Sequence, residues 1–419
     1  MMSNTLCGIA SHLFVEVTQL CPWRNSWVVS LLLLAGCGGA QATNLARARI
    51  DTLPGGRVEV SNEGPTSWTD SLDVLVEEGR FQGEDGTPAE LGEPRSIAVD
   101  EAGRIYIVDS KPAAIKVFTP DGKLIRSIGR EGEGPGEFRV GFIAVRGGHL
   151  VLHDPQVART SVFDTAGNYL RGWHSSCCYW TDIQLDKQNR ISVPSTGRAK
   201  PGEQRGTSYV RWSLEGTVLD TLWVPRRDPG KTWTVELKRG GKSVMAMSTG
   251  VPFMPQTTLA LHPEGGFVYG WTGQYRVVRS ATGQDSLRIF GRSWTPDAIS
   301  DERRKAEVES KIKQTAEAFG EENARSAFKL EDVPGTLPAY LNLRVDEASR
   351  VWVRRYGVAD TLRTSYDVFD STGAFLGPVT IPLKLNEWGL QAWTRDALVA
   401  IIEDAEGRPT VVRLRLRRP

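Results

Sequence analysis

The chain has 419 residues, of which 51 are Lys or Arg and 50 are Asp or Glu, and 40% are hydrophobic. This balance is typical of a globular protein, so it excludes a disordered tail and a polycationic nucleic-acid binder. Chains of this length usually divide into two or three domains, but repeat folds escape that expectation because each added unit extends the core. Internal repeats are therefore the first feature to examine.

Residues 1–36 are predicted to be a signal peptide. Their apolar stretch, Trp27–Ala35, is far shorter than the roughly 20 residues that a membrane-spanning helix needs. It follows Arg24 and ends in Leu34-Ala35-Gly36-Cys37, where small residues precede a cysteine as at a cleavage site. These four residues resemble a bacterial lipobox, which implies cleavage before Cys37 and acylation of its thiol and new amino group. The alternative is a plain signal peptide with an incidental cysteine.

The lipid implied at Cys37 would hold the mature chain at a membrane. The residue directly after the cysteine is Gly38 and not Asp, which in such lipoproteins indicates the outer membrane if the cell has one. Residues 37–67 are small and polar and are interpreted as a flexible tether. The sequence thus predicts a lipid-anchored, extracytoplasmic protein of the cell envelope, periplasmic or surface-facing, with no nucleic-acid partner.

Two cysteines remain in the mature chain beside the lipidated one, and they are adjacent. Cys177 and Cys178 could close a strained vicinal disulfide in an oxidising compartment, which would be readily reduced. The alternative is a pair of thiols in a loop or at a strand end.

A hairpin pattern recurs six times. Each copy has two apolar residues separated by one, a turn of about five residues and a second such pair, which is the two-residue period of β-strands. The turns carry polar residues and Gly, as in Asp100–Arg104. The copies pair Ile97 and Val99 with Ile105 and Ile107; Ile143 and Val145 with Leu150 and Leu152; Ile183 and Leu185 with Ile191 and Val193; Leu259 and Leu261 with Phe267 and Tyr269; Leu343 and Val345 with Val351 and Val353; and Leu390 and Ala392 with Leu398 and Ala400.

A second hairpin follows the first in five of the six copies, marked by Gly122, Gly167, Gly216, Gly283 and Gly373. Four antiparallel strands repeated about every 40 to 50 residues indicate a propeller blade. We therefore predict an all-β, six-bladed β-propeller over residues 68–419.

The sixth copy has one strand too few, because only Thr410–Arg418 follows its first hairpin. Ser71–Phe81 lies upstream of the first copy and has period-two character without a partner of its own. We expect this N-terminal strand to complete the sixth blade, which closes the ring and removes an exposed sheet edge.

The first copy carries a more specific resemblance. Gly92–Asp100, Gly103–Ser110, Ile115–Phe118 and Gly132–Phe138 together resemble an NHL repeat. The whole chain is similar to bacterial six-bladed propeller lipoproteins related to NHL-repeat proteins, and the resemblance implies no particular activity because most of these have none assigned.

Two segments interrupt the repeat. Pro225–Pro255 is rich in Pro, Gly and basic residues and is interpreted as a long loop. Pro296–Lys329 is dense in Glu, Lys, Arg and Ala, which predicts an inserted helical segment over about residues 296–329 that begins after Thr295. Its thin apolar stripe favours packing over a role as a cap on the axial pocket.

Metal ligands are sparse in the mature chain. The histidines are His149, His153, His174 and His262, and no HExxH or CxxC motif occurs. Asp109 and Asp154 hold equivalent places beyond the second strand of the first two copies, but later copies have no carboxylate there. Six-bladed lactonases of the gluconolactonase and paraoxonase type use axial calcium, so a calcium-dependent hydrolase, lactonase or lyase is the alternative function on fold analogy.

The prediction for function is a ligand- or protein-binding scaffold with no assignable reaction, and whether it is an enzyme stays open. Partners are the membrane, through the lipid, and an envelope protein or a small-molecule or glycan ligand; a purely structural envelope component is a third alternative. Loops from successive blades converge at the mouth of the axial channel, so any site is expected there. The candidate ligand-binding residues are Arg95, Asp109, Asp154, His174, Tyr179, Trp180, Trp271 and Arg354.

Overall fold

The computed structural model describes residues 47–63, 66, 68, 75–175, 183–195, 208–225, 230–239, 242–356, 363–385 and 390–417. All of them belong to one compact unit, Asn44–Pro419. The predicted signal peptide, Cys37, Cys177, Cys178, Tyr179 and Trp180 lie outside the described residues, so what the sequence predicts for them stays a prediction.

Six sheets, each with a core of four antiparallel strands, form a ring, which confirms the predicted six-bladed β-propeller. Blade 1 contains β4 (Pro94–Val99), β5 (Ile105–Ser110), β6 (Ala113–Phe118) and β7 (Leu124–Ile128). Blade 2 contains β10 (Phe142–Arg146), β11 (His149–Asp154), β12 (Arg159–Asp164) and β13 (Tyr169–His174), and the short pair β8 (Arg130–Glu131) and β9 (Glu137–Phe138) precedes it. Blade 3 contains β14 (Gln184–Leu185), β15 (Ile191–Ser195), β16 (Ser208–Trp212) and β17 (Val218–Trp223).

The remaining blades follow the same order. Blade 4 contains β20 (Thr257–Leu261), β21 (Phe267–Trp271), β22 (Arg276–Ser280) and β23 (Arg288–Arg292). Blade 5 contains β24 (Leu343–Val345), β25 (Val351–Arg354), β26 (Thr364–Phe369) and β27 (Phe375–Ile381). Blade 6 contains β28 (Gln391–Trp393), β29 (Ala397–Glu403), β30 (Pro409–Leu416) and β3 (Leu75–Phe81).

The apolar pairs of the sequence set the register of the hairpins. In blade 1 Val99 lies opposite Ile105 and Ile97 opposite Ile107, as predicted. Apolar side chains of β4 to β7 and of β10 to β12 form one buried cluster, so the core lies between successive sheets. Each blade is therefore held by packing against its neighbours.

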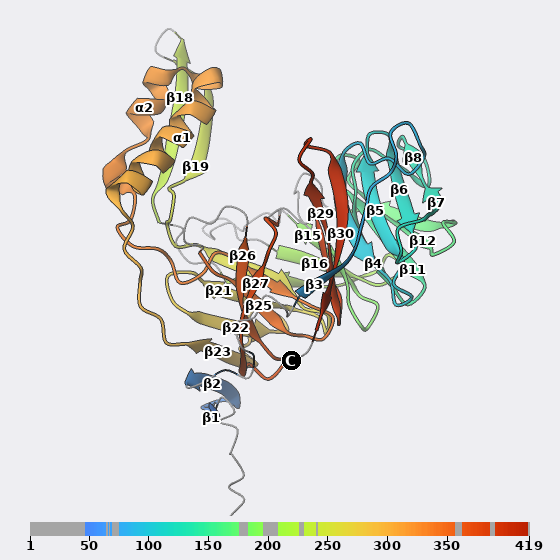
Figure 1. Cartoon of the computed structure of the whole chain (residues 1–419), viewed down its shortest axis with the longest axis horizontal. Coiled ribbons are helices and arrows are strands. Elements are labelled where there is room, and N and C mark those ends of the chain that lie inside the picture. Colours follow the sequence, from blue (N-terminus) through green and yellow to red (C-terminus); the bar gives the residue numbers. More distant parts are fainter. Residues whose placement is uncertain are drawn as a thin grey trace, which may run out of the picture. The chain divides into compact units, whose positions relative to one another are not determined.

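The N-terminal strand closes the ring. β3 pairs antiparallel with β30, with Leu75 opposite Leu416 and Phe81 opposite Val411. In Figure 1 the blue strand β3 runs beside the red strand β30, so the two ends of the propeller meet within one blade. The predicted closure is confirmed.

The first hairpin of blade 6 differs from the predicted register by one residue. Leu398 lies opposite Trp393, not opposite Ala392. The turn is shorter than predicted because the Thr394 hydroxyl accepts the Ala397 N–H at 2.9 Å. A slip of one residue exchanges the two faces of a strand, so Trp393 packs on the side of Leu398 and Ala392 on the other.

Part of the predicted flexible tether is a hairpin. β1 (Arg47–Leu53) and β2 (Arg57–Glu63) are joined by a turn at Pro54-Gly55-Gly56, and β2 pairs in parallel with β23 at the outer edge of blade 4. Val60 is only 2% exposed. The prediction of a flexible tether over residues 37–67 is therefore wrong over 47–63, because an open strand edge and alternating valines outweigh the polar composition.

The long loop predicted at Pro225–Pro255 is also wrong over much of its length. β18 (Thr232–Arg239) and β19 (Lys242–Gly250) form an antiparallel hairpin there. Trp233 and Val235 are two residues apart on β18 and both are buried, which is the period of a strand. The many basic residues and glycines around them made this period hard to recognise in the sequence.

The predicted helical segment is confirmed, with a later start and a break. Ser300 caps α1 (Asp301–Phe319), accepting the Arg303 N–H, and Gly320 separates α1 from α2 (Glu321–Ala327), which precedes the 3₁₀ turn η2 (Leu330–Asp332). The helices lie beside β18 in Figure 1, and their apolar stripe shares one buried cluster with that strand. The two insertions thus pack on each other. None of the helices in the described part of the chain combines the length and hydropathy needed to cross a bilayer.

Candidate functional site

The first strand of every blade lines an axial channel. β4, β10, β14, β20, β24 and β28 each form one edge of their sheet, and residues of all six surround a cavity of about 250 Å³. Its lining includes one apolar residue near the end of each of these strands: Val99, Val145, Leu185, Leu261, Val345 and Trp393. Polar residues such as Gln184, Arg344 and Gln391 lie between them, so the channel wall is mixed in polarity.

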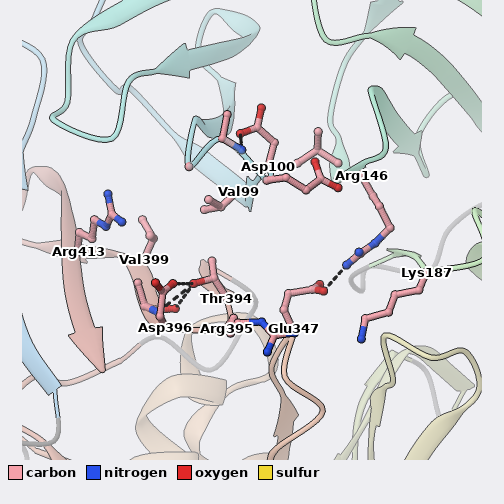
Figure 2. A pocket seen from close by; sticks show the side chains of 15 residues that line it. Val99, Asp100, Arg146, Lys187, Glu347, Thr394, Arg395, Asp396, Val399 and Arg413 are labelled. Atoms are coloured by element: carbon pink, nitrogen blue, oxygen red, sulfur yellow. Dashed lines mark hydrogen bonds and ion pairs between the residues drawn. The ribbon is translucent and has the colours of Figure 1, made fainter. Parts of the chain in front are cut away.

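A second cavity, of about 540 Å³, forms the mouth of the channel where the first strands turn into the second strands. Figure 2 shows charged side chains from several blades around it. The charged lining residues are Asp100, Glu101, Arg146, Lys187, Glu347, Arg395, Asp396 and Arg413. Charges of both signs thus surround the entrance to the channel.

One type of turn builds much of this mouth. In blade 1 Asp100 accepts the N–H groups of Ala102 and Arg104 at 3.0 and 2.8 Å and the Arg104 Nε at 2.6 Å. The carboxylate is thereby occupied by its own turn. The following residue, Glu101, lines the mouth.

Blades 3 and 5 repeat this turn. Asp186 and Asp346 each accept the backbone N–H groups two and four residues later and the Nε of the arginine four residues later, over 2.6–3.0 Å. Lys187 and Glu347 follow them and line the mouth. The repeated pattern Asp-x-x-(Gly, Asn or Ser)-Arg therefore fixes a turn, and the residue after its Asp differs in charge from blade to blade.

An ion pair joins opposite sides of the mouth. The Arg146 guanidinium of blade 2 binds the Glu347 carboxylate of blade 5, three blades away (Figure 2). Arg146 Nε also donates to the Leu185 carbonyl at 3.1 Å. The Arg146 side chain is 17% exposed and that of Glu347 is 41% exposed, so the cation is fixed and its acidic partner is the more accessible member.

Other charges at the mouth are differently engaged. Lys187 pairs with Glu264 of blade 4, and this hydrogen bond holds the pKa of Glu264 below its usual value. Glu101 accepts the Gly147 N–H at 2.9 Å. Arg395 is exposed and forms no ion pair with the residues that the structure describes. The mouth can therefore offer a cation to an incoming acid without breaking a contact.

The described residues of the predicted rim lie at the far end of the strands, away from this mouth. Asp109, Asp154, Trp271 and Arg354 are at or near the ends of second strands, and Arg95 follows the start of β4. His174 ends β13 of blade 2. It lies opposite Arg159 of β12, which in turn lies opposite Asp154 of β11. These residues are thus distributed over several blades at one end of the propeller.

Two of these carboxylates are buried and bonded to the chain. Asp109 accepts the N–H groups of Gly92 and Glu93 at 2.9 and 2.7 Å and pairs with the buried Lys116 at 2.8 Å. Asp154 accepts four backbone N–H groups, from the connection before β10 and the turn after β11: those of Arg139, Val140, Gln156 and Val157. Both anchor connections at the ends of strands, and a ligand role for the predicted rim stays a prediction.

A buried hydrogen-bonded trio also lies in blade 2. His153 Nδ1 is 3.2 Å from both the Thr160 and the Ser175 hydroxyl, and the two hydroxyls are 2.9 Å apart. Burial lowers the pKa of His153 to about 4. Over the described ranges of the chain, no group of three or more His, Cys, Asp or Glu side chains is placed to hold a metal ion.

A match to a family model supports the fold. Residues 88–144 match the family DUF5128, described as a 6-bladed beta-propeller. Comparison with curated proteins gives no significant match. A protein from Bacteroides fragilis described as exported is similar at 13% identity over 86% of this chain and 100% of that chain, with a TM-score of 0.46.

Two further solved structures are similar at comparably low sequence identity. A member of the DUF4221 family from Bacteroides vulgatus has 12% identity over 82% of this chain and 97% of that chain, with a TM-score of 0.48. A catalytically inactive virginiamycin B lyase from Staphylococcus aureus with quinupristin has 11% identity over 81% and 100%, with a TM-score of 0.38. Likenesses at this level carry no argument about ligands or reactions.

Proposed function

We propose that this protein is an extracytoplasmic, lipid-anchored propeller that binds a carboxylate-bearing ligand, free or on a protein, at the mouth of its axial channel. The observation that supports this most is the ion pair between Arg146 and Glu347 from opposite blades. A guanidinium presents paired donors that match a carboxylate. Glu347 thus occupies the place that a carboxylate of a ligand would take.

The surroundings of Arg146 favour exchange of one acid for another. Its Nε is held by the Leu185 carbonyl, so the cation keeps its position when Glu347 leaves. Glu347 is the more exposed partner, and Arg395 and Lys187 line the same cavity. An acid that enters the mouth would therefore meet a pre-positioned guanidinium and nearby cations.

Ligand binding is tested by thermal unfolding of the mature chain with a panel of small probes: succinate, glutamate and putrescine. Succinate and glutamate are expected to raise the melting temperature by a few degrees at saturating concentration, about the effect of 2–3 kcal/mol of binding linkage. Putrescine, which lacks a carboxylate, is expected to leave it unchanged.

Two variants locate the effect. Arg146→Gln is expected to abolish the shift, whereas Arg95→Gln, at the far end of the strands, is expected to retain it. No shift with either carboxylate, or equal shifts in wild type and Arg146→Gln, would contradict the proposal. Metal analysis after native purification tests the calcium alternative separately.

The lipid anchor rests on the sequence before Cys37. Cells that express the full chain and are fed radiolabelled palmitate are expected to label the wild type and not Cys37→Ala. Labelling of both proteins would contradict the anchor without affecting the binding proposal.

A further inference from the structure

A third cavity, of about 410 Å³, continues from the mouth between blades 4 and 5. Lys187 and Arg395 line both this cavity and the mouth, so the two hollows adjoin. Its other walls come from the turn before β21, from β22 and β23, and from the turns of blade 5, and they include His262, Arg279, Leu287, Arg288, Ser349 and Asp370. We call this cavity the radial groove.

The radial groove carries more positive than available negative charge. Arg279 donates to the Gly265 carbonyl at 2.6 Å, and Arg288 donates to the Thr372 carbonyl at 2.5 Å, so these two guanidinium groups are anchored by neutral oxygens. Of the acids, Glu264 pairs with Lys187. Asp370 uses its Oδ1 for three hydrogen bonds within its own turn.

His262 lines the same groove as these cations. This imidazole is 6% exposed and accepts the Glu264 N–H at 3.1 Å, a role that requires a neutral ring nitrogen. Burial and the positive charges of Arg279 and Lys187 together lower its pKa to about 3. The cations of the groove thus act on a group buried in its wall.

We propose that the radial groove binds an extended acidic peptide segment whose leading carboxylate enters the mouth at Arg146. This inference rests on the proposed function and names the partner of the same site. Charge complementarity favours an acidic chain. Leu287 is 50% exposed on the groove wall and offers apolar contact, whereas Phe290 is 3% exposed and presents no aromatic face for a sugar ring.

Fluorescence anisotropy tests the proposal with the mature chain and a labelled ten-residue peptide of alternating Glu and Leu. Alternating Lys and Leu peptides and a polygalacturonate oligomer serve as the other probes. The acidic peptide is expected to bind at least about tenfold more tightly than the basic peptide, and its affinity is expected to fall as salt is raised because the charges are screened.

Arg288→Gln separates the groove from the mouth, because Arg288 lines only the groove. This substitution is expected to lower the affinity for the acidic peptide about tenfold. It is expected to leave the rise in melting temperature with succinate unchanged. Arg126→Gln is the matched control: Arg126 of blade 1 donates to the Ala166 carbonyl of the next blade at 2.8 Å, just as Arg288 does to Thr372, but lines neither cavity. It is expected to bind like wild type.

The outcomes distinguish the two proposals. Equal peptide affinity in wild type and Arg288→Gln, with the succinate shift present, would overturn the groove proposal and leave the proposed function standing. Tighter binding of polygalacturonate than of the peptide, lost in Arg288→Gln, would also overturn it and identify an acidic polysaccharide instead. No binding of peptide together with no succinate shift would overturn both.

Discussion

The two ends of the blades use buried aspartates in different ways. At the far end Asp109 and Asp154 accept backbone N–H groups from the connections that enter or leave their blades. At the mouth Asp100, Asp186 and Asp346 accept N–H groups of their own two-strand turns. In both places the carboxylate is engaged in hydrogen bonds to the backbone.

The difference lies in the neighbours of these aspartates. At the mouth the residue after each Asp varies in charge and lines the cavity, as Glu101, Lys187 and Glu347 do. An equivalent carboxylate in several repeats is therefore evidence for a structural role here, whereas variation beside it indicates the part of the turn that is available for binding.

The largest expected effect is at the far end, from Asp109→Asn. This change leaves the buried Lys116 ammonium without its charged partner, so the free energy of unfolding should fall by about 3–5 kcal/mol. Urea denaturation measures it. Succinate affinity of the folded fraction should stay within about twofold of wild type, a difference of less than roughly 0.5 kcal/mol. A loss of binding without a loss of stability would place the ligand at the predicted rim instead.

His153 gives the next largest effect, as a pH dependence. Its pKa is about 4 in the folded chain and near 6.5 when unfolded, so the unfolded chain binds more protons between these values. Stability should therefore fall as the pH is lowered from 6.5 to 4, with a contribution of roughly 3 kcal/mol from this group. Denaturation of wild type and His153→Asn across this range should show a shallower slope in the variant. Equal slopes would mean that the imidazole is not held neutral.

Asp186→Asn is the counterpart of Asp109→Asn at the mouth, with a smaller effect on stability. The amide can still accept backbone N–H groups but loses its charge-assisted bond with the partly exposed Arg190, at about 1–2 kcal/mol. Because the turn positions Lys187, succinate affinity should fall about threefold, or roughly 0.6 kcal/mol. Calorimetric titration checks this. Unchanged affinity would show that Lys187 does not contribute to succinate binding.

The sequence was sufficient for the blades and their closure, because β-branched residues at period two leave few alternative registers. The sequence did not determine the register of the first hairpin of blade 6, because two registers fit Leu390 and Ala392. The Thr394 hydroxyl shortens the turn there and selects the observed register. The hairpin β18–β19 was hidden because β19 is exposed along nearly its whole length and shows no alternation.

The candidate residues that the structure describes lie at the opposite end of the strands from the mouth, and their ligand role stays a prediction. The sequence prediction included carboxylates that recur between repeats, such as Asp109 and Asp154, whereas most charged residues at the mouth differ between repeats. The signal available in the sequence was the turn pattern itself, which begins at Asp100, Asp186 and Asp346 and ends at an arginine four residues later. What the pattern could not reveal is that Arg146 and Glu347, from opposite blades, meet across the axis.

Calorimetric titration of succinate into Glu347→Gln tests most directly whether Glu347 stands in for the carboxylate of a ligand. If it does, removal of its charge frees Arg146, and succinate should bind about tenfold more tightly than to wild type, a gain of about 1.4 kcal/mol. If the pair between Arg146 and Glu347 only shapes the mouth, Glu347→Gln should bind succinate no better than Arg146→Gln does. That second result would contradict the account.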